Sequence, residues 1–141
     1  IAAALSRAMA EPLASSRVAA LGLTFKAGTC DVRDSPALAI SGRLSGMGAQ
    51  IIGYDPRLAM IDHDALRRCA VAAVDDPYLA TKEADAIVVF TEWPEFTELD
   101  WARIGDQAPG AVVLDTRNVL DRGVIAEAGR TYLGNGRAAG F

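Results

Sequence analysis

Short apolar runs alternate with longer amphipathic stretches along most of this chain. The runs lie at Arg17–Gly22, Gln50–Tyr54, Val71–Val74, Ala86–Phe90, Val112–Asp115 and Thr131–Leu133. Continuous apolar runs of four or five residues are typical of parallel strands that are covered on both faces. The pattern therefore predicts an α/β protein with a Rossmann-like, doubly wound parallel sheet between two helical layers.

The stretches between the runs carry helix signals. They predict helices at Pro36–Met47, Asp62–Cys69, Tyr78–Ala84, Trp101–Asp106 and Asp121–Ala128. The clearest start is Ser35 as cap with Pro36 at the first helical position. Because crossovers between parallel strands are right-handed, we expect alternate helices to cover opposite faces of the sheet.

The two ends of the chain differ from this pattern. Ile1–Leu13 is rich in alanine and predicts one helix that leads straight into the first strand. Because the chain begins with Ile1 and not with Met, we expect residues 1–14 to end a helix that enters from upstream. Residues 15–141 would then be one domain of a larger protein. The tail Gly134–Phe141 is rich in glycine and alanine and is expected to pack loosely.

The composition of the chain limits the kinds of protein, partner and compartment that fit it. Hydrophobic residues make up 51% of the 141 residues, which fits one globular domain, and the formal charge of −4 argues against nucleic acids and acidic membranes as partners. No apolar run approaches the roughly 20 residues of a membrane span. Cys30 and Cys69 lie far apart, which indicates a reducing compartment and a cytoplasmic protein. His63 is the single histidine, so no metal site is predicted.

Polar residues follow three of the predicted strands. Phe25 and Lys26 follow the first, Trp93 follows Ala86–Phe90, and Arg117 follows Val112–Asp115. Carboxyl ends of parallel strands share one edge of a sheet, where ligands bind. Lys26 and Arg117 would flank one crevice there, with Phe25 or Trp93 packing on a flat base, which suits a nucleoside diphosphate. The alternative is that both cations are solvated loop residues.

Two common nucleotide signatures are missing. The first strand is not followed by G-x-G-x-x-G, and the lysine in Gly22–Thr29 does not fit the phosphate-loop pattern. Binding of NAD or ATP in the usual way is therefore not predicted. Cys30 has no histidine near it in sequence, and Asp31 and Asp34 disfavour its thiolate. We assign no catalytic residue to the chain.

Several separated motifs together resemble one family. They are Gly22-Leu23-Thr24-Phe25-Lys26, Thr29-x-Asp31-x-Arg33-x-Ser35-Pro36, Gly48-Ala49, Tyr54-Asp55-Pro56, Ala84-Asp85-Ala86, Thr91-Glu92-Trp93-Pro94-Glu95-Phe96 and Asp115-x-Arg117-Asn118. Their order and spacing resemble the carboxy-terminal domain of the UDP-glucose/GDP-mannose dehydrogenases. The resemblance runs from Val18 to Gly136.

This resemblance implies roles for particular residues. In the family, an NAD-dependent four-electron oxidation turns the sugar C6 alcohol into a carboxylate. The first domain binds NAD, a central segment supplies a catalytic cysteine, and the carboxy-terminal domain holds the nucleotide. Phe25 and Lys26 would contact the substrate, Arg117 would hold the nucleotide, and Arg33 would reach NAD across the cleft. The domain alone would be inactive, because its catalytic groups lie elsewhere in a full-length enzyme that is expected to be a homo-oligomer.

The identity of the sugar nucleotide stays open at this point. Thr91–Phe96 is most similar to the UDP-glucose branch of the family, whereas Lys26–Thr29 is also similar to the GDP-mannose branch. The domain of a UDP-N-acetylhexosamine dehydrogenase is a further alternative. A non-catalytic nucleotide-binding or interaction domain that has kept the fold is the remaining one.

Overall fold

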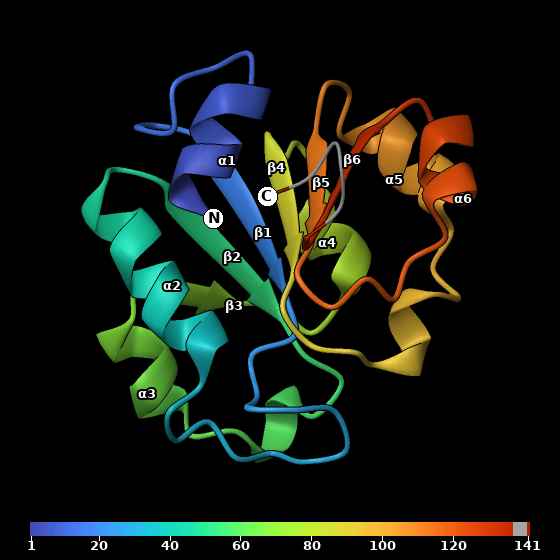
Figure 1. The fold of residues 1–141 in the computed structure, drawn as a ribbon. Helices are drawn as coiled ribbons and strands as arrows, with labels where there is room; N and C mark the ends of the chain where they lie inside the picture. The colour runs from blue at the N-terminus through green and yellow to red at the C-terminus, as the bar shows by residue number, and fades with distance from the viewer. Residues whose placement is uncertain (137–140) are drawn as a thin grey trace.

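The computed structural model describes residues 1–136 and 141 of the chain. In this part, six parallel strands form one sheet in the order β3-β2-β1-β4-β5-β6 (Figure 1). The strands are β1 Arg17–Leu21, β2 Gln50–Tyr54, β3 Val71–Ala73, β4 Ala86–Val89, β5 Val112–Asp115 and β6 Thr131–Gly134. The helices are α1 Ala2–Ala8, α2 Pro36–Gly46, α3 His63–Arg68, α4 Pro77–Thr81, α5 Trp101–Gln107 and α6 Arg122–Glu127. The short 3-10 helices are η1 Leu58–Met60 and η2 Pro94–Phe96. The predicted Rossmann-like fold is confirmed.

The helices are grouped on the two faces and do not alternate. Buried side chains of α1, α2 and α3 pack on one face, and those of α4, α5 and α6 pack on the other. The expected alternation is wrong because the chain steps outward from β1 to β2 to β3 before it crosses back to β4. With right-handed crossovers, the connecting helices stay on one face while successive strands are added in one direction across the sheet, and they change face when that direction reverses. The chain reverses direction once, after β3, so the strand order changes between β1 and β4.

The central strand β1 shows why its sequence is apolar without alternation. Val18 and Ala20 belong to the core on the α2 side, and Ala19 and Leu21 belong to the core on the α4 side. All four side chains are at most 1% exposed. A strand that is buried on both faces needs apolar residues at every position.

The first helix is shorter than the sequence predicts. It ends at Ala8, and Met9 is extended with φ −78° and ψ 144°, so the prediction of a helix as far as Leu13 is wrong. A longer helix would need the amide of residue 12 to donate to the carbonyl oxygen of Ala8, and Pro12 has no amide hydrogen. Met9 and Leu13 are nevertheless buried against the core, so this connection is packed although it is irregular.

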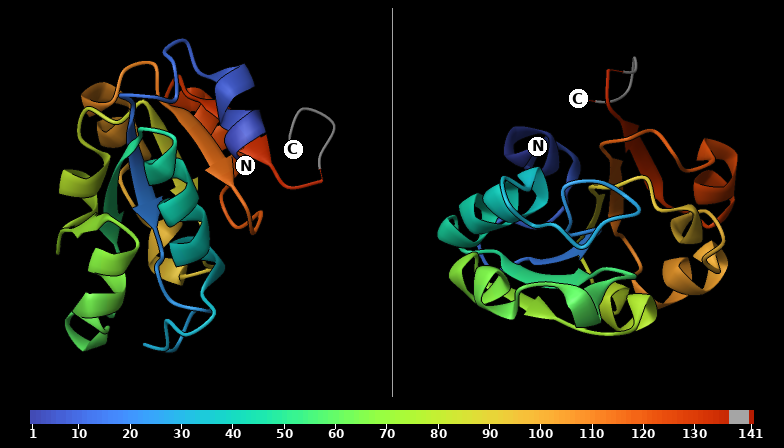
Figure 2. Two further views of the ribbon diagram at one scale, coloured as in Figure 1. Left: turned by 90° about the vertical axis from the view of Figure 1, so that its left-hand side faces the viewer. Right: turned by 90° about the horizontal axis from the view of Figure 1, so that it is seen from below.

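The two described ends of the chain lie close together (Figures 1 and 2). Gly134 belongs to β6, and its carbonyl oxygen accepts a hydrogen bond from the amide of Phe141 at 3.3 Å. Residues 137–140 of the predicted loose tail lie outside the described residues. Among the residues described, no helix combines the length and apolar character needed to span a membrane.

Candidate functional site

Three loops leave the sheet side by side at its carboxyl edge, the edge formed by the carboxyl ends of the strands. Leu21 pairs with Val89 and Val89 pairs with Asp115, so β1, β4 and β5 end level with one another. The loop after β1 (residues 22–35) is called the Lys26 loop, and the loop after β5 (residues 116–120) the Arg117 loop. Figure 1 shows the Lys26 loop at the bottom of the molecule. Ligands of doubly wound folds bind at this edge, where the strand order reverses.

The loops after β1 and β4 touch at Gly22. This residue has φ +89°, and a Cβ atom built on it would lie 1.8 Å from Thr91 Oγ1. A residue with a side chain would therefore be strained and would also collide with Thr91 in the loop after β4. Glycine lets the two central loops leave the sheet in direct contact.

Asp55, at the end of β2, fixes the start of the Lys26 loop. Its side chain is 1% exposed. Its Oδ2 accepts hydrogen bonds from the amides of Leu23 at 2.8 Å and Thr24 at 3.3 Å, and its Oδ1 accepts from the amide of Arg57 at 2.8 Å. A buried carboxylate needs such donors, and here they are backbone groups of two neighbouring loops.

Phe25 and Lys26 are exposed on this anchored loop. Phe25 is 47% exposed, and its amide donates to the carbonyl oxygen of Asp31 at 2.8 Å. The hydroxyl of Thr24 donates to the carbonyl oxygen of Lys26 at 3.1 Å. Within residues 1–136 and 141, the Lys26 ammonium has no ion-pair partner. The loop therefore presents an aromatic face and an unpaired positive charge.

Arg117 is held at the other side of the reversal point. Its Nε donates to the carbonyl oxygen of Phe90 at 3.0 Å and lies 3.5 Å from Glu92 Oε2. Its amide donates to Asp115 Oδ1 at 3.1 Å. Asp115 is fully buried, and its Oδ2 accepts from the amide of Leu120 at 2.9 Å and from the hydroxyl of Tyr132 at 3.1 Å. The guanidinium remains partly open to solvent, because the Arg117 side chain is 41% exposed.

A cavity of about 250 Å³ lies beside Arg117. Its other lining residues are Ile1, Pro36, Ile40, Phe90, Thr116 and Asn135. The cavity thus lies between the first turn of α2 and the ends of β4 and β5. Lys26 is not among its lining residues, so the two cations share an edge of the sheet but not this cavity.

Trp93 is almost buried beneath the edge. It is 6% exposed and packs in the core on the α4 side. The Arg57 guanidinium lies 6.0 Å from the centre of its ring, and its Nε1 has no hydrogen-bond partner among the described residues. Phe25, and not Trp93, exposes aromatic surface at this edge.

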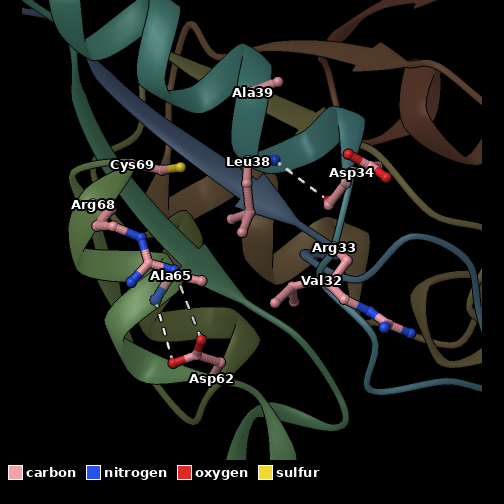
Figure 3. Close-up of a pocket in the computed structure, with 10 residues that line it drawn as sticks. Val32, Arg33, Asp34, Leu38, Ala39, Asp62, Ala65, Arg68 and Cys69 are labelled. Atoms are coloured by element: carbon pink, nitrogen blue, oxygen red, sulfur yellow. Dashed lines mark hydrogen bonds and ion pairs between the residues drawn. The ribbon is translucent and has the colours of Figure 1, made fainter.

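Arg33 lies farther along the Lys26 loop and forms a two-pronged pair with Asp31. Its Nε lies 3.0 Å from Oδ1 and its Nη2 2.9 Å from Oδ2 of that carboxylate. The hydrogen bond from Arg33 lowers the pKa of Asp31 from 3.8 to about 2. The Arg33 side chain is 87% exposed. Arg33 is one of the residues around a cavity of about 350 Å³, and in Figure 3 its side chain points away from α3.

The two cysteines lie in different parts of the fold. Cys30 is an exposed free thiol, and Cys69 is half-buried at the cavity drawn in Figure 3. No three His, Cys, Asp or Glu side chains of the described residues gather in a way that could hold a metal ion. At the carboxyl edge, the described loops are held by hydrogen bonds to two buried carboxylates, Asp55 and Asp115.

The buried acceptor roles of Asp55 and Asp115 were missed at the level of sequence. Both residues directly follow or end an apolar strand, and the sequence singles them out only within the family motifs Tyr54-Asp55-Pro56 and Asp115-x-Arg117-Asn118. An acidic residue at the end of a fully buried strand is the available signal. Such a residue is either aimed at a ligand or bound to the backbone of neighbouring loops.

Known proteins that are similar to the chain share this domain. Residues 19–122 match the family model described as "UDP-glucose/GDP-mannose dehydrogenase family, UDP binding domain". A UDP-glucose 6-dehydrogenase of Rhizobium meliloti is 40% identical over 122 residues, which are 86% of this chain and 28% of that protein.

Two solved structures extend the comparison. A UDP-D-ManNAc dehydrogenase of Pyrococcus horikoshii matches with a TM-score of 0.72 at 28% identity, over 97% of this chain and 29% of the other. An NDP-N-acetyl-D-galactosaminuronic acid dehydrogenase of Methanosarcina mazei matches with a TM-score of 0.76 at 25% identity, over 96% and 27%. This chain spans less than a third of the length of these relatives. It belongs to the UDP-glucose/GDP-mannose dehydrogenase family, whose UDP-binding domain it contains.

Proposed function

We propose that the carboxyl edge holds the nucleoside diphosphate of a UDP-sugar, as part of an NAD-dependent UDP-glucose 6-dehydrogenase. The observation that carries this proposal is the placement of Lys26 and Arg117 on loops at either side of the strand reversal. Phe25 stands next to Lys26 and exposes an aromatic face. These groups suit a ligand with two phosphates and an attached planar or ring-shaped part.

The two cations would have different tasks. An ammonium is a mobile point charge that suits a pyrophosphate, whereas a guanidinium offers a planar fork. Lys26 would meet the phosphates, and Arg117 would hold the nucleotide portion beside its cavity. Phe25 would pack on the substrate. Trp93, which lies beneath the edge, would support these loops from the core.

The other parts of the reaction would come from the rest of the enzyme. Arg33, which points outward on its loop, would reach an NAD molecule that is bound mainly by another domain. The catalytic groups would also lie outside this chain, so the isolated domain should not produce NADH from UDP-glucose and NAD. We expect the complete enzyme to be a homo-oligomer.

Glucose is the proposed sugar because the sequence relative from Rhizobium meliloti is a UDP-glucose 6-dehydrogenase. The two solved structures carry the names of N-acetylhexosamine enzymes, which keeps a UDP-N-acetylhexosamine as the second candidate. The GDP-mannose branch differs in the base. Comparing UDP with GDP therefore tests the base independently of the sugar.

A titration with amide chemical shifts as the readout tests the proposal. Because other domains would complete the site, we expect UDP to bind weakly, with a Kd of about 1 mM. UDP should move the resonances of Phe25, Lys26 and Arg117 more than inorganic phosphate does. Preference for GDP would assign the domain to the GDP-mannose branch. Absence of shifts in these loops with UDP, GDP and phosphate would contradict the proposal.

Arg117→Ala should weaken UDP binding about tenfold or more, because a hydrogen bond to a charged group is worth about 1.5–3 kcal/mol. Arg43→Ala is the matched control. Arg43 is an exposed arginine in the last turn of α2, at the opposite end of that helix from the carboxyl edge. The substitution Arg43→Ala removes the same positive charge as Arg117→Ala and should leave the affinity for UDP unchanged.

A further inference from the structure

We infer that Asp55 is a positioning residue for the substrate: it acts through the Lys26 loop without touching the ligand. The inference rests on the proposed function of Lys26. It starts from a contrast in burial within one short segment. Asp55 and Thr24 are almost fully buried, whereas Phe25 and Lys26, directly after Thr24, are exposed.

The contacts of Asp55 form a continuous connection to Lys26. Its Oδ2 accepts from the amides of Leu23 and Thr24, and it lies 3.4 Å from Thr24 Oγ1. The same hydroxyl lies 3.1 Å from the carbonyl oxygen of Lys26. One carboxylate oxygen therefore orients the two residues that precede Phe25, and the Thr24 hydroxyl fixes the backbone of Lys26.

The other carboxylate oxygen makes this role specific to an aspartate. Oδ1 accepts from the amide of Arg57 at 2.8 Å, so both oxygens of Asp55 face backbone N–H donors. Asparagine has nearly the same shape but only one acceptor oxygen. Its NH₂ group would face a donor on one side, so either the Lys26 loop or the turn at Arg57 would lose its anchor.

Asp115 provides a matched comparison. It is equally buried and also accepts backbone amides with both oxygens, but these amides belong to Arg117 and Leu120. Asp115→Asn therefore removes the same charge and the same kind of hydrogen bond from the other loop. A general loss of stability would affect both variants alike, whereas a positioning effect would be confined to one loop.

A double-mutant cycle on UDP affinity tests the inference. Lys26→Ala should weaken UDP binding about tenfold in the wild-type background. Asp55→Asn should also weaken it about tenfold, and Lys26→Ala added to Asp55→Asn should cost less than twofold more. In the Asp115→Asn background, Lys26→Ala should keep its full effect. A purely structural role of Asp55 would leave the effect of Lys26→Ala the same in both backgrounds.

The outcomes separate this inference from the proposed function. If Lys26→Ala leaves UDP affinity unchanged in the wild type, the proposed role of Lys26 is wrong. If it weakens binding equally in wild type and Asp55→Asn, the positioning role of Asp55 is wrong. Amide shifts of residues 23–26 give a readout without ligand. They should change in Asp55→Asn and stay in place in Asp115→Asn, and the reverse result overturns the inference.

A second pair of variants applies if Asp55→Asn does not fold. Thr24→Val has a similar shape, keeps the amide that Asp55 binds, and removes the hydroxyl that donates to the carbonyl oxygen of Lys26. It should weaken UDP binding about threefold, whereas Thr24→Ser, which keeps the hydroxyl, should restore the wild-type affinity. Equal affinities of Thr24→Val and the wild type would overturn the inference.

Discussion

The Lys26 loop and the Arg117 loop differ in how far along the sequence their anchors lie. Asp55 directly follows the neighbouring strand β2 and is 32 residues from Leu23, the first residue that it binds. Asp115 ends the strand from which its own loop leaves, and it binds amides two and five residues ahead. The position of Lys26 therefore depends on the assembled sheet. The turn at Arg117 is largely set by its own segment.

The Arg117 loop also has support from the edge strand. The hydroxyl of Tyr132 in β6 donates to Asp115, and the side-chain amide of Asn118 donates to the carbonyl oxygen of Asn135 at 3.0 Å. The Lys26 loop instead extends past the sheet and returns to it at the start of α2. There, the hydroxyl of Ser35 donates to the carbonyl oxygen of Leu23 at 2.8 Å. A long loop fixed at both ends and exposed between them contrasts with a short loop supported by its neighbours.

Gly22→Ala should have the largest effect on the Lys26 loop, because it changes the residue with which this loop leaves β1. The backbone strain at φ +89° and the collision with Thr91 Oγ1 should together lower the free energy of unfolding by about 3–5 kcal/mol. Urea denaturation measures the change. Gly28→Ala, at φ +82° with no atom within 4 Å of the new Cβ, should cost only about 1 kcal/mol. Equal losses in the two variants would show that the contact between Gly22 and Thr91 does not affect stability.

Tyr132→Phe should affect the Arg117 loop alone. It removes a buried hydroxyl that donates to Asp115, and the free energy of unfolding should fall by about 1–2 kcal/mol. Amide resonances of residues 116–120 should shift while those of residues 23–26 stay in place. Tyr78→Phe is the control. The Tyr78 hydroxyl accepts a hydrogen bond from the exposed amide of Asp100, so loss of this hydroxyl should lower the free energy of unfolding by less than about 0.5 kcal/mol. Shifts in both loops would contradict their independence.

The smallest expected effect concerns the exposed pair within the Lys26 loop. Following the carboxyl carbon shift of Asp31 against pH should give a pKa of about 2, because Arg33 stabilises the charged form. Arg33→Gln should return this pKa toward 3.8, the ordinary value. Arg43→Gln should leave it unchanged. An Asp31 that titrates at the same pH with and without Arg33 would exclude the pair in solution.

The sign of the linked stability follows from the lowered pKa. The folded protein holds the proton on Asp31 less tightly than the unfolded chain does. The contribution is therefore present above pH 3.8 and is lost as the pH falls through about 2. It should be small, because both side chains face solvent.

The sequence predicted the central strands β1, β4 and β5 well because they are buried on both faces. Strand β4 (Ala86–Val89) illustrates this: its four consecutive residues are all apolar and all buried, as expected for a strand at the centre of the sheet. The grouping of the helices was not predictable from local signals, because it depends on the spatial order of the strands. The end of α1 at Ala8 was missed because alanine favours helix, whereas Pro12 and the packing of Met9 decide the outcome.

The placement of Lys26 and Arg117 at one edge was predictable from the sequence, whereas the residues that support their loops were not. Lys26 and Arg117 follow apolar strands, and parallel pairing brings such positions to one edge. Trp93 follows a strand in the same way but is buried, because the short helix that comes after it folds back over the α4 side of the core. The role of Asp55 depends on a contact between β2 and the loop after β1, and residue type alone does not reveal it.

The inward-facing carboxylate of Asp55 has a consequence for protein engineering. In dinucleotide-binding domains with the same strand order, an acidic residue at the end of the second strand binds the ribose hydroxyls of the cofactor. Asp55 occupies that place in the fold, but backbone amides already use both of its oxygens. A designer who grafted a glycine-rich phosphate motif after β1 would change the path of this loop and so move the backbone amides at positions 23 and 24 that this carboxylate requires. Conversion to a dinucleotide-binding domain would therefore require redesign of the loops after β1 and β2 together. The redesign would succeed only if the Asp55 carboxylate turned outward toward the ligand.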